Sequence, residues 1–135
     1  MTIIVDSREQ LPYEFEGAIR KAPTGDYSVV GFENQIALER KALNDFLACV
    51  GRERDRFERE LERMRTIPFA ALVLEASLAD VLRNAGGLHP YSLIGTIAAW
   101  TMRYRLPILF AENRTLAETL TARLLAKAAK YVHWE

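Results

Sequence analysis

Four carboxylates among the first 45 residues stand where an acidic side chain is costly. Asp6 directly follows a short β-branched run, and Glu9 comes three residues later. Asp26 follows Gly25 in a turn-like segment, and Glu39 comes near the end of an otherwise apolar stretch. A charged carboxylate at the end of an apolar strand is unfavourable unless it is paired, hydrogen-bonded or bound to a cation. These acids are therefore candidates for a site.

Asp26, Glu39 and Lys41 have the composition of a metal-dependent phosphodiesterase site. Two carboxylates can hold a hard cation such as Mg²⁺ or Mn²⁺ and leave positions for water and phosphate. The cation lowers the pKa of its water and neutralises charge on the phosphoryl oxygens. Lys41 lies two residues after Glu39, so both side chains project from one face of a strand. An ammonium there can orient the water or stabilise the transition state. The triplet alone is a weak indication.

The hydrophobic pattern predicts the elements that position these residues. Strands are expected over residues 2–5, 35–41, 69–74 and 106–110, with short strands and turns over 13–31. Helical spacing begins at residue 42, continues through 52–65 to a stop at Pro68, and returns after the loop 84–90. A final helix carries Leu116, Leu120 and Leu124 on one face. Ser77 with Asp80, and Thr115 with Glu118, have the spacing of capping boxes. This order predicts a mixed sheet covered by helices.

The composition bounds the class of protein. The 135 residues fit a single domain over 1–135, and half of them are hydrophobic, which excludes a disordered chain. The net charge is zero, which argues against a basic nucleic-acid tail but leaves room for a local basic groove. One cysteine, Cys49, excludes an internal disulfide framework. No signal peptide or membrane span is visible, so we expect a soluble, intracellular, DNA-associated domain without a membrane partner.

Three segments in order carry a specific resemblance over about the first 65 residues. They are Val5-Asp6-Ser7-Arg8-Glu9, Gly25-Asp26-Tyr27, and Glu39-Arg40-Lys41 with Asp45 four residues after the lysine. This pattern resembles the signature of the XPF-type nuclease domain, a family that cuts branched or flapped DNA in excision repair and replication-fork processing. The resemblance implies a restriction-endonuclease-like α/β fold, a mixed sheet flanked by helices, and metal-dependent DNA hydrolysis.

The resemblance also assigns roles to the matching residues. Asp26 and Glu39 would ligate Mg²⁺ or Mn²⁺, helped by the backbone carbonyl of Arg40 and by Asp6, directly or through water. Lys41 would position the nucleophilic water. Arg8 and Arg40 would hold phosphate or brace the carboxylates. Glu9 and Asp45 would contact the ligand residues rather than the metal itself.

The arginine-rich run 52–65 leaves two interpretations open. It holds six arginines and five acids and could be a solvated helix with i,i+4 ion pairs. The family's Gly-Arg-aromatic-x-x-Gln turn corresponds either to Gly51-Arg52 or to Arg56-Phe57, with Glu60 in place of the Gln. Arg52 and Arg56 join Arg8 and Arg40 as candidates for DNA contact.

Two features of the family bear on partners. Its members dimerise through this domain, so a homodimer or a pair with a related protomer is expected. The family also contains inactive protomers, so the alternative is a catalytically silent DNA-binding subunit. Such protomers usually lose the metal carboxylates or the lysine, and this sequence keeps all of them.

Overall fold

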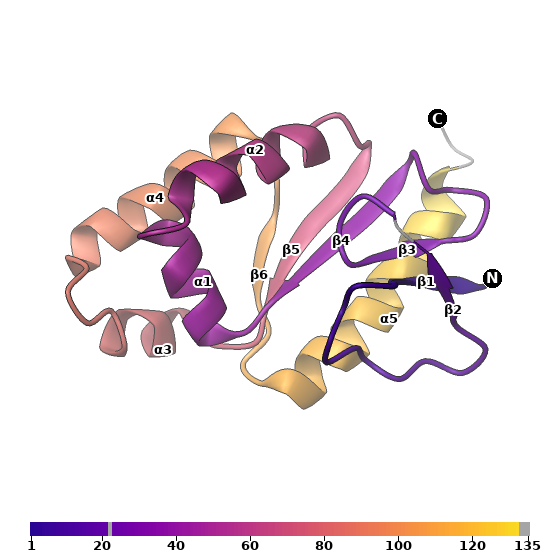
Figure 1. The fold of residues 1–135 in the computed structure, drawn as a ribbon, viewed down its shortest axis with the longest axis horizontal. Helices are drawn as coiled ribbons and strands as arrows, with labels where there is room; N and C mark the ends of the chain where they lie inside the picture. Colours follow the sequence, from indigo (N-terminus) through magenta and orange to yellow (C-terminus); the bar gives the residue numbers. More distant parts are fainter. Residues whose placement is uncertain (22, 133–135) are drawn as a thin grey trace.

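A single mixed sheet holds the segments that carry the motifs (Figure 1). The computed structural model describes residues 1–21 and 23–132. The strands are β1 (Ile3–Asp6), β2 (Ile19–Lys21), β3 (Tyr27–Val29), β4 (Ile36–Lys41), β5 (Phe69–Leu74) and β6 (Ile108–Phe110). They are ordered β2-β1-β3-β4-β5-β6. β4, β5 and β6 run parallel, whereas β3 is antiparallel to both β1 and β4. The ends of β1 and β4 and the start of β3 therefore meet at one place.

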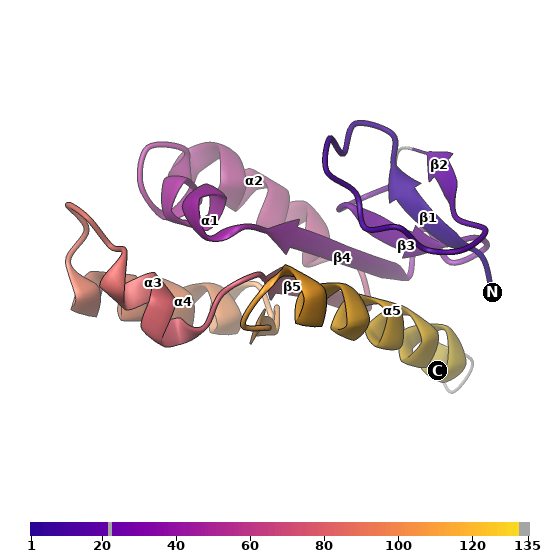
Figure 2. The ribbon, with the colours of Figure 1, turned by 90° about the horizontal axis from the view of Figure 1, so that it is seen from below.

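Helices cover both faces of this sheet. They are α1 (Leu43–Val50), α2 (Arg54–Met64), α3 (Leu78–Arg83), α4 (Pro90–Arg103) and α5 (Arg114–Tyr131). Figure 2 shows α1 and α2 on one side of β4 and α5 on the other. None of the helices in the described part of the chain is long and apolar enough to cross a bilayer.

Alternation along β4 decides which face each motif residue reaches. Ala37 packs in the core under α1–α4, whereas Ile36 and Leu38 pack in the core under α5. Because successive strand side chains point to opposite faces, Glu39 and Lys41 project toward α1 and α2. Arg40 projects toward α5.

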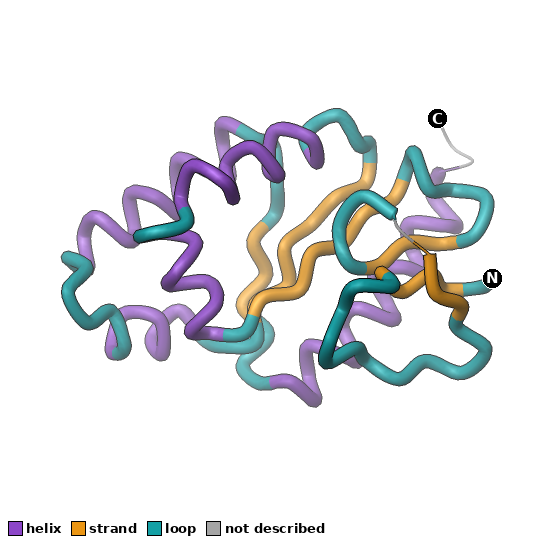
Figure 3. Tube along the Cα trace, viewed as in Figure 1, coloured by secondary structure: helices purple, strands orange, loops and turns teal. Residues whose placement is uncertain are grey.

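The order of elements expected from the sequence is confirmed, including the capping box in which Ser77 and Asp80 exchange hydrogen bonds. The helix expected to run on from residue 42 is interrupted, because α1 ends at Val50 and α2 begins at Arg54 (Figure 3). Gly51 caps α1, and glycine is a poor helix former. The break lets α2 change direction and run back over the end of β4.

The structure corrects the expected cap of the last helix and one position of its apolar face. The cap of α5 is Asn113, whose side chain accepts a hydrogen bond from the Leu116 N–H, and not Thr115. Asparagine is among the best N-cap residues, and it lies two positions earlier. The fully buried positions are Ala117, Thr121 and Leu125. Of the expected leucines, Leu120 and Leu124 are partly buried and pack against the same core, whereas Leu116 is exposed. The small side chains of Ala117 and Thr121 let the helix lie close to the sheet.

Candidate active site

The turn before β3 fixes Asp26 against the ends of two strands. The Asp26 N–H donates to the Leu38 carbonyl at 2.8 Å, and the Asp6 N–H donates to the Asp26 carbonyl at 2.8 Å. The Arg40 N–H donates to Asp26 Oδ2 at 2.8 Å. Gly25 makes this approach possible because its φ is +75° and a Cβ there would lie 2.9 Å from the Leu38 oxygen.

Glu39 is a buried carboxylate, and only one of its two oxygens is paired within the part of the chain that the structure describes. Its side chain is 4% exposed, and Oε2 lies 3.3 Å from the Lys41 Nζ. Oε1 is buried and has no hydrogen-bond partner among the described residues. Burial, then the nearby carboxylates of Asp26 and Glu60, raise the pKa of Glu39 well above its usual value. A buried anion in this setting is unfavourable unless a positive charge offsets it.

Asp26 shares that environment. Burial raises its pKa to about 6, opposed by the hydrogen bond from the Arg40 N–H. Among residues 1–21 and 23–132, no three His, Cys, Asp or Glu side chains are arranged to hold a metal ion. Asp26 and Glu39 offer carboxylate oxygens of the kind that a hard cation takes, and backbone oxygen or water would complete its coordination.

Lys41 keeps its charge beside these acids. Its ammonium lies over the Phe57 ring, 5.1 Å from the ring centroid, and its side chain is only 20% exposed. Burial lowers the pKa of Lys41, but Glu39 and other nearby acids outweigh that effect and raise it overall. Lys41 is therefore a hydrogen-bond donor and a positive charge here, not a base. Burial raises the pKa of the neighbouring Cys49 to about 11, so its thiol stays protonated.

Asp6 and Arg8 form the rim of the site next to β1. The Asp6 carboxylate is buried and accepts hydrogen bonds from the Arg8 N–H, Nε and Nη2 at 3.0–3.1 Å. The Arg8 side chain is nonetheless 74% exposed. With Asp6 already occupied by Arg8, its predicted role as a ligand through water fits better than direct ligation.

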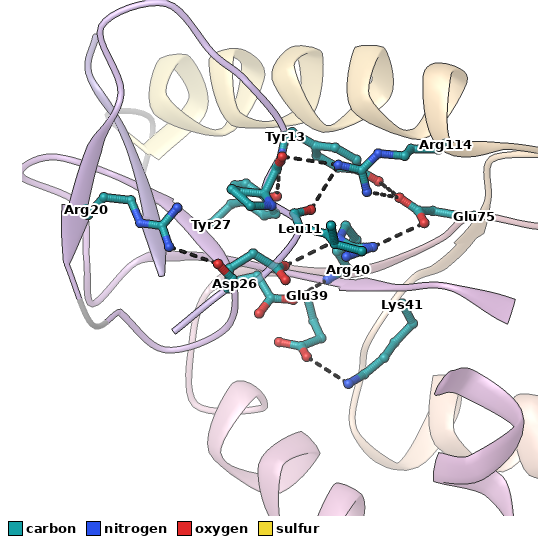
Figure 4. Close-up of polar contacts among 12 residues, drawn as sticks. Leu11, Tyr13, Arg20, Asp26, Tyr27, Glu39, Arg40, Lys41, Glu75 and Arg114 are labelled. Carbon is teal, nitrogen blue, oxygen red and sulfur yellow. Dashed lines mark hydrogen bonds and ion pairs between the residues drawn. The ribbon is translucent and has the colours of Figure 1, made fainter. Parts of the chain in front are cut away.

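Arg40 and Glu9 lie on the opposite face of the sheet, as Figure 4 shows for Arg40. Arg40 is held between Glu9 at 3.3 Å and Glu75 at 3.1 Å, and its side chain is 9% exposed. Tyr13 donates to Glu75, and Arg114 lies 3.5 Å from it. The alternative in which the Arg40 side chain holds phosphate does not fit this burial, whereas the alternative in which it braces carboxylates does.

The family assignment follows from comparison. A model of the ERCC4 domain matches residues 5–124. The chain belongs to the ERCC4 domain family. No curated protein matches the sequence. XPF from Aeropyrum pernix is similar in structure with a TM-score of 0.78 and 18% identity, over 98% of this chain and 67% of that chain. XPF from the same organism in complex with DNA is similar with a TM-score of 0.75 and 21% identity, over 96% of this chain and 65% of that chain.

These comparisons confirm the XPF-type nuclease fold expected from the motifs. This ERCC4 domain corresponds to about two thirds of the archaeal XPF chains. The residue roles remain predictions that rest on the geometry.

Helix α2 settles which arginine of this ERCC4 domain lies near the lysine. Asp45 and Arg56 line a hollow of about 190 Å³ with Lys41 and Glu60. Arg52 lines a different hollow, on the side of α1 next to Leu88, away from the acids. The Arg56-Phe57 alignment, with Glu60 in place of the Gln, is therefore the one that reaches the site.

Three residues near the motifs were not among the site residues predicted from the sequence, although Glu60 was noted in place of the family's Gln. Glu75 directly follows the apolar strand β5, which is the same signal that singled out Glu39. Glu60 and Arg63 lie on α2 four and seven residues after Arg56, the spacing of one helical face. The sequence shows that spacing. It does not show the direction of α2, because that direction depends on the break after α1.

Proposed function

We propose that this ERCC4 domain is a divalent-metal-dependent DNA endonuclease that hydrolyses phosphodiester bonds in branched, flapped or junction DNA. One observation carries the proposal: a buried, unpartnered oxygen of Glu39 lies in the same acidic environment as Asp26, with the Lys41 ammonium 3.3 Å from the other oxygen. Membership of the ERCC4 family and similarity to an XPF structure in complex with DNA support it.

Each residue of the candidate site would have a distinct role in hydrolysis. Asp26, Glu39 and the Arg40 carbonyl would hold Mg²⁺ or Mn²⁺, with Asp6 acting through water. A bound divalent cation supplies a water of lowered pKa and neutralises charge on the phosphoryl oxygens. Lys41 donates to the attacking water or to the oxygen that gains charge. Arg8 presents its exposed guanidinium to a phosphate at the rim.

The bracing network behind β4 keeps this arrangement in place. Arg40 is anchored from its side chain by Glu9 and Glu75 while its N–H holds Asp26. The residues on either side of it, Glu39 and Lys41, are thereby fixed on the opposite face. Such preorganisation lets donors act on developing charge without rearrangement.

The alternative of a silent DNA-binding subunit has no observation in its favour. Each of the two ligand carboxylates and the lysine is present. They lie within the short range over which their charges affect one another.

A cleavage assay on single-stranded, duplex, flap and fork DNA, with and without Mg²⁺ or Mn²⁺, tests the proposal. Asp26→Asn keeps the shape and an acceptor for the Arg40 N–H but removes charge that a hard cation needs. We expect the variant to keep the wild-type circular dichroism, to lose cleavage, and to bind Mn²⁺ more weakly in calorimetry. Full activity of Asp26→Asn with Mg²⁺ would contradict the metal assignment.

We also propose that the domain forms a homodimer. Tyr91, Ile94 and Met102 of α4 are 79%, 41% and 78% exposed. Their spacing places them on one face of the helix. Exposed apolar side chains grouped in this way are typical of an interface.

A further inference from the structure

The arginines of α2 and of its C-cap, Arg65, fall into two classes. Arg54, Arg56 and Arg65 each form an ion pair with an acid of the same segment. Arg59 and Arg63 are exposed, and neither side chain has an ion pair or a hydrogen bond within residues 1–21 and 23–132. A guanidinium offers five N–H donors in a fork that suits phosphate. Arg59 and Arg63 therefore have their donors available for a ligand.

These two arginines lie on a trough that leads to the candidate site. Glu60 separates the hollow at Lys41 from a second hollow of about 340 Å³, lined by Asp6, Arg8 and Arg63 among others. A third hollow, of about 510 Å³, is lined by Thr24, Arg59, Glu62, Arg63 and Thr66. Thr24 and Arg63 line both the second and the third hollow. The three hollows thus follow one another along α2.

The trough carries Arg8, Arg59 and Arg63 beside the acids Asp6, Glu60 and Glu62, and within the described structure only Arg8 of these arginines is paired with one of the acids. Arginine and threonine side chains are common phosphate ligands, and such contacts position the strand without reading its sequence. Arg59 and Arg63 are four residues apart, about 6 Å along the helix axis, so both guanidinium groups can reach one sugar-phosphate chain.

The trough lies between two elements. One wall is α2, and the other is the Pro23–Gly25 turn that also holds Asp26. A sugar-phosphate chain along it would pass directly to the candidate site. A strand in the trough would run past Asp6 and Glu60 with its phosphates toward Arg8 and Arg63.

We propose that Arg59 and Arg63, with Thr24, bind successive phosphates of one DNA strand that leaves the candidate cleavage site. This inference rests on the proposed function and adds to it the path of the substrate. The inference gives Arg59 and Arg63 a role in DNA contact that the arginines engaged in ion pairs do not share.

Binding of labelled single-stranded and flap DNA in Ca²⁺, followed by fluorescence anisotropy at several salt concentrations, tests the path. Arg59→Gln/Arg63→Gln keeps side-chain length and removes two positive charges. The matched control, Arg65→Gln/Arg83→Gln, removes two positive charges from arginines that are paired with Glu62 and Asp80. We expect the first pair to lose at least tenfold in affinity and to flatten the salt slope by about 1.4, or about 0.7 for each phosphate contact. The control should change affinity less than threefold.

The possible results separate the two proposals. Equal losses in both double variants, or no loss in either, would overturn the trough while leaving cleavage by the wild type untouched. Loss confined to Arg59→Gln/Arg63→Gln, with no cleavage by the wild type of any DNA, would support the trough and remove the proposed activity. A wild type that binds no DNA, or that prefers RNA of the same sequence, would overturn the path. Melting followed by circular dichroism confirms that each variant is folded.

Discussion

At Lys41 the surroundings fix both position and charge. The side chain is held between Glu39 and the Phe57 ring, and the nearby acids keep it protonated. A protonated lysine stabilises charge that appears only as the phosphodiester breaks, so its loss affects the rate more than the affinity. We expect Lys41→Ala to lower the cleavage rate by about 10²–10³-fold, the usual effect of losing one preorganised donor. A time course of product formation measures this.

The control for Lys41 is DNA affinity in Ca²⁺, which often holds such a site without supporting cleavage. That affinity should change by less than about tenfold, since Lys41 acts on charge that is absent from the bound substrate and appears only in the transition state. Lys127→Ala, on α5, removes the same charge far along the chain from the motifs and should leave both quantities unchanged. If Lys41→Ala weakened binding and left the rate intact, Lys41 would be a DNA contact alone.

At the scale of elements, the Gly25 turn connects stability to the site. Alanine there meets two obstacles, a φ of +75° and a Leu38 oxygen 2.9 Å from its Cβ. Gly31 is the matched control, because its φ is +89° but nothing lies within 4 Å. The left-handed conformation alone costs about 1–2 kcal/mol at either position. We expect Gly25→Ala to lower the melting temperature more than Gly31→Ala and to reduce cleavage, since it displaces Asp26. Equal shifts in melting temperature would show that the turn has room to adjust.

The start of α5 gives a second prediction at this scale. Asn113 accepts a hydrogen bond from the Leu116 N–H at 2.9 Å, whereas the Thr115 side chain makes no capping bond. Replacing an N-cap asparagine by alanine costs about 1 kcal/mol of stability. Urea denaturation should therefore show a lower midpoint for Asn113→Ala and almost no change for Thr115→Ala. The reverse result would restore the cap expected from the sequence.

At the scale of the whole molecule, α4 carries the apolar surface that a second copy would cover. The inner face of this helix is already used, because Leu93 and Trp100 are buried in the core. Ile94 and Met102 face outward. We expect Ile94→Glu/Met102→Glu to shift the protein to monomer in sedimentation at micromolar concentration, with its melting temperature nearly unchanged. A wild type that sediments only as a monomer and still cleaves DNA would contradict the homodimer.

Much of this protein is determined locally in the chain. The apolar strands, the Pro68 stop and the Ser77 capping box each depend on a few adjacent residues, and all were predictable. The same holds for Glu39 and Lys41, because the two-residue period of a strand places them on one face whatever the rest of the fold does. The ordered acidic motifs also identified the family that the comparison confirms.

The direction of α2, the role of Arg40 and the buried face of α5 depend on tertiary structure. The direction of α2 after Gly51 brings Arg56, Glu60 and Arg63 to the acids and leaves Arg52 apart. The sheet order brings Glu75 of β5 beside Arg40 of β4, which turns that side chain into a brace. On α5 the buried face depends on how closely the helix approaches the sheet. Each of these contacts joins residues from different elements, so no spacing along the chain could specify it.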